Sequence, residues 1–404
     1  MHRAKLEVGA IVRRYEAAFL DRYGTSVSLH QAKVLKALAA CRTPAMGGHL
    51  YECDHCHKRC VTLNSCRDRH CPTCRVSLAA EWADARSAEL LPVPYFFATF
   101  TLPHALNPLA IENAAIVYAL LFQSVSEALL RLAADPARLG AQIGFFSVLH
   151  TWGEQLQYHP HVHVVVPGGG LSPDGLRWIR ARPKFLLAAR ILSKRFRTIF
   201  SRLLRDAFDD GKLTFRSATL ERVADRSAFN DLVSSLWVRD WVVHVEPPRG
   251  TPTAVIRYLA RYTHRIAISN ARLVAIDDNK VTFRYKDYAD SRKPKTLTLD
   301  ATEFIRRFLL HVLPKGFVRI RYYGFLANRH RSDKLDLCRK LIADTLPDSA
   351  PPPPSSDHTD SVASPEAKTA KRPCPTCKTG NLCFVRELKA NNSLLVTLPL
   401  TNSS

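Results

Sequence analysis

The chain has 404 residues, of which 46% are hydrophobic, so it is long enough for two or three domains with a sizeable core. Lysine and arginine number 58 against 36 acidic residues, and the net charge of +22 points to a polyanionic partner, with nucleic acid as the first expectation. The N-terminus lacks the apolar segment of a signal peptide, and the most apolar window, residues 114–126, is too short to cross a bilayer. We therefore expect no membrane partner and a cytoplasmic, nucleoid-associated location.

In chain order, the sequence divides into five regions by composition and periodicity. Apolar residues at helical spacing predict an N-terminal helical region, a cysteine-rich stretch follows it, and the long central part mixes helical stretches with strand-like ones such as YFFATFTL. That mixture predicts an α+β domain. A proline-rich segment with few large apolar residues then predicts a disordered linker before a C-terminal cysteine motif and tail. The regions span residues 1–48, 49–78, 79–335, 345–373 and 374–404.

Six cysteines lie within residues 53–74, which in a large chain without an export signal indicates metal binding rather than disulfides. Cys53 and Cys56 form one C-x2-C pair, and Cys71 and Cys74 form a second. Two such pairs can complete a tetrahedral structural zinc site with no open position for catalysis. Spare candidates could replace one ligand or hold a second ion: Cys60, Cys66, His55, His57 and His70.

Two further features accompany these cysteines. Arg67, Arg69 and Arg75 lie among the expected ligands and are suited to phosphate contacts. Near the C-terminus, Cys374, Cys377 and Cys383 could form another small zinc knuckle, although its fourth ligand is not evident from the sequence.

The stretch HPHVHVVVPGGG places histidines at every second position, so a β-strand would present them on one face. We favour His161 and His163 as ligands of one divalent cation, because His159 precedes a proline at the mouth of the strand. The preceding residues predict a hairpin with a turn near residues 153–160. Its first arm could supply His150 as the third ligand, and the turn could supply Glu154 or Gln155; periodicity does not choose between them.

Tyr258 and Tyr262 are four residues apart, so a helix would place both on one face, surrounded by Arg257, Arg261 and Arg265. Half-buried packing tyrosines would give the same spacing. Beside a metal site, however, tyrosine hydroxyls and arginines are the groups that DNA strand transfer through a phosphotyrosine needs. The basic and aromatic segment 317–331, with Arg319 and Arg321, suits single-stranded DNA, and an ordinary hairpin end with a solvated basic face would give the same composition.

Taken together, these motifs resemble the two-tyrosine HUH transposases of rolling-circle insertion sequences. The resemblance rests on the order of CDHC and NSCRDRHCPTC, then HPHVHVVVPGGG, then YLARYTHRIAISNARL, then RIRYYGFLANRHR, and it covers most of residues 10–335. It implies an HUH endonuclease core with a central antiparallel sheet, flanking helices and an N-terminal zinc-binding module. It also implies Mg²⁺ or Mn²⁺ at His161 and His163.

The same resemblance implies that a tyrosine attacks single-stranded DNA at the element ends, leaving a 5′-phosphotyrosine and a free 3′-OH. The second tyrosine would accept the second strand end, without a nucleotide cofactor. The chain carries no G-x-x-x-x-G-K-[ST] motif, so any helicase would come from the host. Two other functions fit parts of the sequence: a non-catalytic zinc-finger DNA-binding protein, and a zinc hydrolase, for which the H-E-x-x-H motif is missing.

Overall fold

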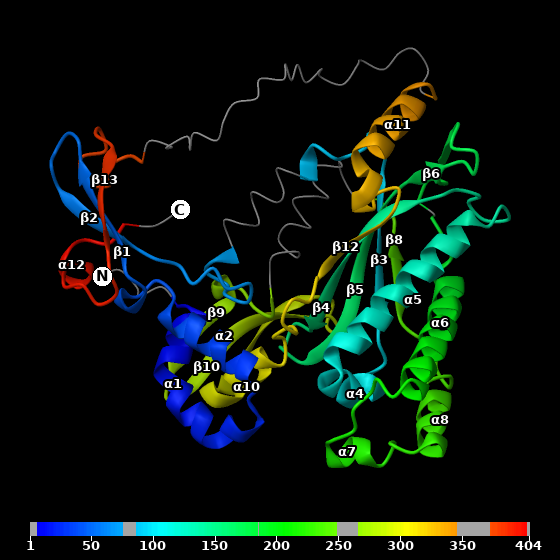
Figure 1. Cartoon of the computed structure of the whole chain (residues 1–404), viewed down its shortest axis with the longest axis horizontal. Helices are drawn as coiled ribbons and strands as arrows, with labels where there is room; N and C mark the ends of the chain where they lie inside the picture. Colours follow the sequence, from blue (N-terminus) through cyan, green and yellow to red (C-terminus); the bar gives the residue numbers. More distant parts are fainter. Residues whose placement is uncertain (1–5, 76–85, 185, 249–265, 346–371, 402–404) are drawn as a thin grey trace.

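The computed structural model describes residues 6–75, 86–184, 186–248, 266–345 and 372–401. It is a mixed α+β structure built around antiparallel sheets, with a separate three-stranded sheet at one end (Figure 1). The expected α+β fold, with a central antiparallel sheet and flanking helices, is confirmed. Short 3-10 helices connect the main elements: η1 Gly24–Ser26, η2 Pro44–Met46, η3 His104–Leu106, η4 Asn270–Arg272 and η5 Asn328–His330.

The central sheet has five strands in the order β12-β4-β5-β3-β8, and each neighbouring pair is antiparallel. The long β4 and β5 form the expected hairpin, and the chain turns back between Trp152 and Tyr158. Large apolar side chains alternate along the strands, so both faces of this sheet carry apolar surface. Helices cover the sheet on both sides and bury that surface. The strands are β3 Tyr95–Thr101, β4 Gly144–Trp152, β5 Tyr158–Pro167, β8 Val243–Glu246 and β12 Ile320–Gly324.

One face of the central sheet packs against α5 and α6, which form the largest hydrophobic cluster with Phe100, Val162 and Val164. Helix α5 is long and apolar enough to cross a membrane by length and composition, but here its apolar side is packed in this cluster. Its composition is therefore that of a core helix. The helix lies beside α6 (Figure 1). The helices on this side are α4 Asn107–Glu112, α5 Ala114–Ala134, α6 Ala189–Asp209, α7 Ala218–Glu221 and α8 Arg226–Ser235.

The opposite face is covered over part of its length by α11 Arg331–Ala343, whose Leu335 packs with Val148 and Val165. The small ribbon of β6 Gly169–Leu171 and β7 Trp178–Arg180 lies beside this cluster. His150, His161 and His163 lie on the same face, because each is an even number of residues from Val148 or Val165 along its strand.

A second body joins the N-terminal helices to a segment from the far part of the chain. Its hydrophobic cluster includes Ile11, Leu35 and Phe304, and it also takes in Trp152 and Leu156 from the β4–β5 turn. We expected residues 79–335 to form one domain. In the structure they are divided between the central sheet with its covering helices and this second body. The elements are α1 Val8–Tyr23, α2 Leu29–Ala40, β9 Leu273–Asp277, β10 Lys280–Asp287, β11 Lys293–Asp300 and α10 Ala301–Leu309.

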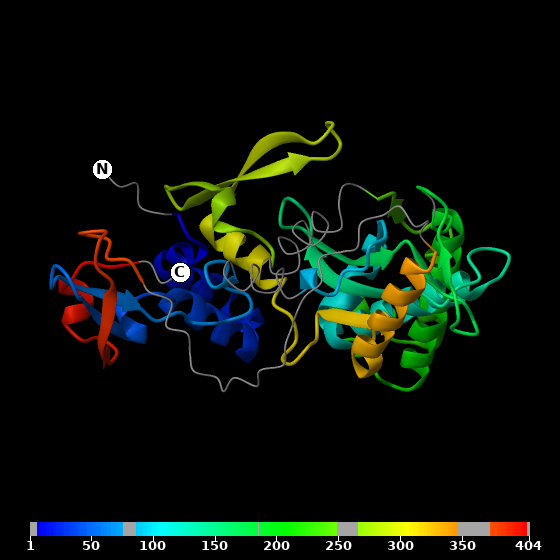
Figure 2. The ribbon, with the colours of Figure 1, turned by 90° about the horizontal axis from the view of Figure 1, so that it is seen from above.

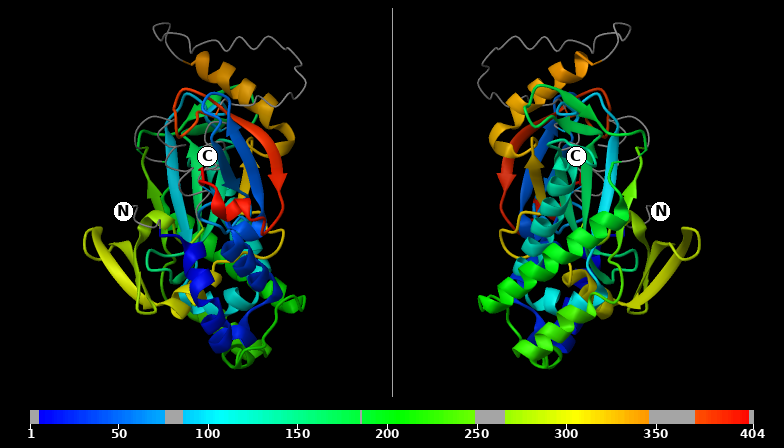
Figure 3. Two further views of the ribbon diagram at one scale, coloured as in Figure 1. Left: turned by 90° about the vertical axis from the view of Figure 1, so that its left-hand side faces the viewer. Right: turned by 90° about the vertical axis from the view of Figure 1, so that its right-hand side faces the viewer.

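The β10–β11 hairpin stands out from this second body (Figures 2 and 3). Val281 and Phe283 anchor its base in the core, whereas residues 293–296 of β11 are exposed. The hairpin is therefore held at one end and open to solvent at the other.

The third part is a sheet in the order β13-β1-β2, which combines the two ends of the chain. Leu50, Val61, Leu388 and Leu395 form its small core. The C-terminal residues are thus a structural part of the cysteine-rich module. The elements are β1 Gly48–Cys53, β2 Arg59–Leu63, β13 Leu382–Leu388 and α12 Leu394–Thr397.

Gly324 at the end of β12 gives a test of this fold. Its φ is +59°, and a β-carbon there would overlap the carbonyl oxygen of Ile143, whereas Gly316 has a φ of +73° and open space around it. We expect Gly316→Ala to lower the free energy of unfolding by about 1–2 kcal/mol, the strain of a left-handed alanine. Gly324→Ala should lower it by a further 1–3 kcal/mol or so, the typical overpacking cost. Urea denaturation of both variants measures the difference, and equal losses would contradict the close β12–β4 approach.

Candidate metal centres and the histidine cleft

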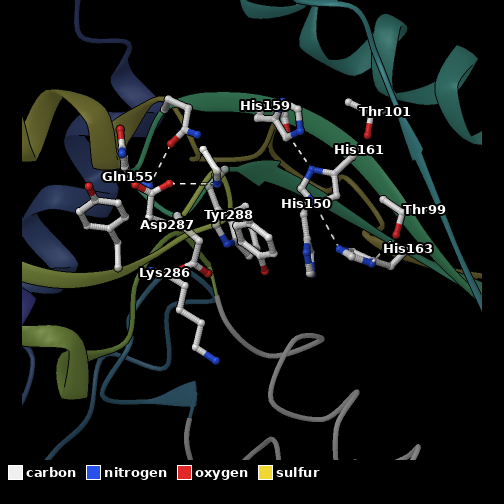
Figure 4. A pocket seen from close by; sticks show the side chains of 16 residues that line it. Thr99, Thr101, His150, Gln155, His159, His161, His163, Lys286, Asp287 and Tyr288 are labelled. Carbon is white, nitrogen blue, oxygen red and sulfur yellow. Dashed lines mark hydrogen bonds between the residues drawn. The ribbon is translucent and has the colours of Figure 1, made fainter. Parts of the chain in front are cut away.

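Strand pairing brings three histidines together. The register of β4 on β5 places His150 opposite His161 and Val148 opposite His163. One ring nitrogen from each of His150, His161 and His163 lies within 4.8 Å of the others, and the Nε2 atoms of His161 and His163 are 3.1 Å apart (Figure 4). The row of imidazoles expected from the alternation is thus present, and its third member comes from the neighbouring strand.

The two β5 histidines are oriented by hydrogen bonds to their other ring nitrogens. His161 Nδ1 donates to the carbonyl oxygen of His159 at 2.7 Å, and Thr99 Oγ1 is 3.2 Å from His163 Nδ1. Both Nε2 atoms are consequently turned toward the centre of the cluster, the arrangement in which an outer partner fixes the tautomer of a metal-ligating histidine.

Burial keeps these imidazoles neutral. It is the largest cause that lowers the pKa of His161 well below its ordinary value, and it lowers the pKa of His163 to about 4. Neutral imidazole is the form that binds a metal ion. Near neutral pH His161 and His163 therefore offer lone pairs without first losing a proton, and the donor set of the three-histidine cluster fits a divalent cation.

The structure separates the three candidates for the third ligand. His150 lies at the cluster, whereas the Glu154 carboxylate is paired with the Arg272 guanidinium at 3.5 Å and accepts the Lys286 amide at 3.3 Å. Gln155 lines the same cleft but lies on the side away from the three histidines (Figure 4). The geometry thus favours His150 as the partner of His161 and His163.

The histidines form part of the wall of a cleft of about 500 Å³. Its opposite wall is the end of the β10–β11 hairpin, residues 285–289, which nothing in the strand pattern had marked as part of the site. Tyr288 is 64% exposed there, and the Arg292 guanidinium lies 5.5 Å from the centre of its ring. The cleft therefore has a histidine side and a hairpin side with aromatic and charged residues, among them Lys286 and Asp287.

The residues expected to contact DNA lie in two parts of the chain. Tyr258, Tyr262, Arg257, Arg261 and Arg265 lie outside the described residues. Arg319 is only 5% exposed, and the Arg321 guanidinium lies 4.4 Å from the centre of the Phe122 ring, on the side of the sheet covered by α5. We therefore do not assign Arg319 and Arg321 to phosphate contacts.

The cysteines form two clusters rather than the one site expected from the two C-x2-C pairs. The first consists of Cys41, Cys66, Cys71 and Cys74, and the second of Cys53, Cys56, Cys374 and Cys377. The two pairs thus belong to different clusters, and each finds its other two thiols elsewhere in the chain. Cys66 is a member of the first cluster, and the C-terminal knuckle finds its missing ligands in Cys53 and Cys56.

Both clusters fit a tetrahedral zinc ion. Zinc–sulfur bonds of about 2.3 Å place neighbouring sulfurs about 3.8 Å apart. The Sγ atoms are 3.5 Å apart for Cys41–Cys74 and 3.6 Å for Cys66–Cys74, and 3.6 Å for Cys53–Cys377 and 3.8 Å for Cys56–Cys374. Four thiolates would hold each ion in a closed structural site without a catalytic position.

His70 does not fit the zinc role expected for it. Its Nδ1 donates to the Asp68 carboxylate at 2.9 Å and its Nε2 accepts the Leu313 amide at 3.1 Å, so both ring nitrogens are used. Cys41 was missed because it reads as the last apolar residue of a helix. Its position 25 residues before Cys66 carries no recognisable spacing.

Zinc content tests this assignment. We expect the purified chain to hold two zinc ions, and Cys374→Ser to hold one, because that substitution removes a ligand from the second cluster only. Cys383→Ser is the matched control and should retain two ions, since Cys383 belongs to neither cluster. Elemental analysis by mass spectrometry gives the count, and a Cys374→Ser protein with unchanged zinc would contradict the pairing.

Comparison with known proteins identifies the family. Residues 144–334 match the family described as "Putative transposase", and residues 11–102 match the one described as "Transposase zinc-binding domain". The chain is 48% identical over 385 residues to "Putative transposase y4qJ" of Sinorhizobium fredii, covering 95% of this chain and 96% of that protein. It is 30% identical over 310 residues to "Transposase for insertion sequence element IS801" of Pseudomonas savastanoi pv. phaseolicola, covering 74% of this chain and 71% of that protein.

No solved structure matches the chain. The two family matches together span the N-terminal cysteines, the histidine strand and the tyrosine pair, in the order that the sequence motifs predict. The chain therefore belongs to the rolling-circle, HUH-type transposases of the IS91/IS801 insertion sequences.

Proposed function

We propose that this transposase nicks and rejoins single-stranded DNA at the ends of its element through a 5′-phosphotyrosine intermediate. His150, His161 and His163 would hold a divalent ion, Mg²⁺ or Mn²⁺, and Tyr258 and Tyr262 would be the nucleophiles. The observation that carries the proposal is the convergence of three histidines in an open cleft, His150 buried and His161 and His163 half-buried, with one ring nitrogen of each within 4.8 Å of the others.

The chemistry needs no redox partner and no nucleotide. The phenol oxygen of one tyrosine forms a bond to the scissile phosphorus, and the bond from phosphorus to the 3′ oxygen breaks. The proton lost by the phenol balances the proton gained by the leaving 3′-OH. The reverse reaction with a different 3′-OH rejoins the strand, because the phosphodiester energy is kept in the covalent link.

A divalent ion at the histidines would polarise the phosphate and stabilise the charge that develops on its oxygens. The chain itself supplies orientation. Thr99 and the His159 carbonyl fix the rings of His163 and His161, and the packed sheet holds those rings at the floor of the cleft. A rigid set of ligands of this kind needs little reorganisation during the reaction.

The flanks of residues 249–265 support the roles given to the tyrosines. Before this segment, β8 pairs with β3 and places His244 opposite Thr99, which lines the cleft. After it, Ile266 belongs to the same hydrophobic cluster as Trp152, which lines the cleft as well. The described residues on either side of the segment that contains Tyr258 and Tyr262 therefore belong to a strand pair and a hydrophobic cluster that also include residues lining the cleft.

The hairpin side of the cleft favours an unpaired strand as substrate. Tyr288 offers an exposed ring on which a base can stack, while Lys286 and Arg292 supply charge for phosphates. In a duplex the bases are stacked on each other, so this ring would have no face to meet. Assistance from a host helicase in exposing the strand belongs to the same proposal.

The test is a covalent-adduct assay. The purified protein is incubated with labelled single-stranded DNA from its element end plus Mn²⁺ or Mg²⁺, and the products are separated under denaturing conditions. We expect a slow protein–DNA band that is lost in the Tyr258→Phe, Tyr262→Phe double variant and reduced at least 100-fold or so in His161→Ala, because removal of a metal ligand removes charge stabilisation.

Matched controls make this assay specific. His159→Ala removes a histidine of the same strand that is outside the three-histidine cluster, and Tyr288→Phe removes a hydroxyl but keeps the ring in the cleft. Both should retain the adduct. Cleavage without an adduct would instead indicate a metal hydrolase, and binding of a verified end sequence without cleavage would indicate a non-catalytic DNA-binding protein.

A further inference from the structure

Three aromatic rings gather on one face of the cysteine-rich sheet. In Figure 1 this sheet of β1, β2 and β13 lies well apart from β4 and β5. Phe384 on β13 lies 5.8 Å from the His49 ring and 5.9 Å from the Tyr51 ring, measured between ring centres, and both of these residues belong to β1. Phe384 is 59% exposed, whereas His49 and Tyr51 are half-buried. This set is called the aromatic platform below.

A cation lies directly on this platform. The Arg372 guanidinium is 5.4 Å from the centre of the Tyr51 ring and donates to the Tyr51 hydroxyl at 3.3 Å. Within residues 48–63 and 372–389 there are six lysines and arginines against three carboxylates. One of those carboxylates, Glu52, is already paired with Arg59 at 2.8 Å. Four zinc-bound thiolates and one Zn²⁺ add a net charge of −2, so the module as a whole is only slightly positive, and its affinity for a polyanion depends on individual cations such as Arg372.

The platform exists only where the two ends of the chain meet. His49 and Tyr51 come from the N-terminal module, and Phe384 and Arg372 come from the C-terminal segment. The second cysteine cluster joins the same two segments through Cys53 with Cys377 and Cys56 with Cys374. Gly380 is required at this junction, because a β-carbon there would lie 2.6 Å from Cys53 Sγ.

We propose that a zinc ion at Cys53, Cys56, Cys374 and Cys377 locks the C-terminal segment onto the N-terminal module, and that the aromatic platform so assembled binds single-stranded DNA by base stacking. The platform is a second DNA-binding site, separate from the cleft. It rests on the proposed function only in taking single-stranded DNA as the ligand.

The chemistry favours this ligand over a protein partner or a duplex. One exposed ring beside two half-buried rings and a guanidinium group, all on a small sheet, is a combination that binds unpaired bases and their phosphates. A duplex offers no free base face to Phe384. A second copy of this basic module would bring like charges together, which opposes pairing of two platforms.

The affinity test measures binding of a fluorescein-labelled oligothymidine to the full, zinc-loaded chain by fluorescence anisotropy. The salt concentration is constant and no Mg²⁺ or Mn²⁺ is added. We expect Phe384→Ala to weaken binding about fivefold or more, as for loss of one base–aromatic stack. Phe384→Tyr should bind like the unaltered chain, and Phe384→Leu should be as weak as Phe384→Ala. Val396→Ala is the control, because Val396 is 71% exposed in α12 of the same module.

The zinc step is tested in the same assay with Cys377→Ser. This variant should lose one zinc ion and weaken binding at least as much as Phe384→Ala, which should itself retain both ions. Unchanged affinity in Phe384→Ala, or Phe384→Leu binding like Phe384→Tyr, would overturn the proposal. A Cys377→Ser protein with one ion and full affinity would overturn the locking role of zinc.

A site-specific measurement keeps the proposal testable even if a variant fails to fold. The unaltered chain is photocrosslinked to an oligonucleotide carrying 5-iododeoxyuridine, and the crosslinked peptides are identified by mass spectrometry. Peptides containing Tyr51 or Phe384 are expected, and crosslinks confined to the cleft hairpin would overturn the platform. Failure of the adduct assay with these crosslinks intact would refute the cleavage proposal alone.

Discussion

The register of β4 against β5 is the constraint on which the histidine site depends. Because His150 pairs with His161, and His163 follows two residues later, all three rings reach one point on one face of the sheet. A slip of one residue would turn His150 to the opposite face, into the cluster under α5. The apolar residues that alternate with the histidines, such as Val162 and Val164, bury that other face. The packing of the sheet against α5 and α6 therefore fixes the geometry of the three histidines.

The two cysteine clusters have a different role. They hold together small segments that have little hydrophobic core of their own. The sheet of β1, β2 and β13 buries only a few leucines and a valine, so two of its segments need a further link. Cys53 and Cys56 supply half of that link, and the C-terminal knuckle supplies the rest. The other cluster ties Cys41, at the end of α2, to the loop that precedes the central domain. In this account the zinc ions are structural, and the proposed DNA cleavage takes place at the histidine cleft.

Local pattern was enough to predict some of this structure, and long-range pairing explains the rest. Alternation along β5 predicted that His161 and His163 share a face, and a short turn predicted that β4 lies next to it. The other two ligands in the cluster of Cys53 and Cys56 could not be predicted from the sequence. A C-x2-C knuckle fixes only two thiolates, and Cys374 is 318 residues from Cys56. His70 was predicted as a zinc ligand and Arg319 as a DNA contact from residue type alone. Both side chains are buried, and their surroundings do not suit those roles. The cleft wall at Tyr288 comes from a hairpin whose sequence carries no signal of the histidines it faces.

Pulsed electron paramagnetic resonance of the chain loaded with one equivalent of Mn²⁺ tests the central claim, a divalent ion on the histidine cluster, most directly. Nitrogen-14 couplings report imidazole bound to manganese. The account predicts such couplings in the unaltered chain and in His159→Ala, with weaker modulation in His150→Phe and none in the His161→Ala, His163→Ala double variant. Manganese bound without nitrogen coupling, or couplings that persist in the double variant, would contradict it.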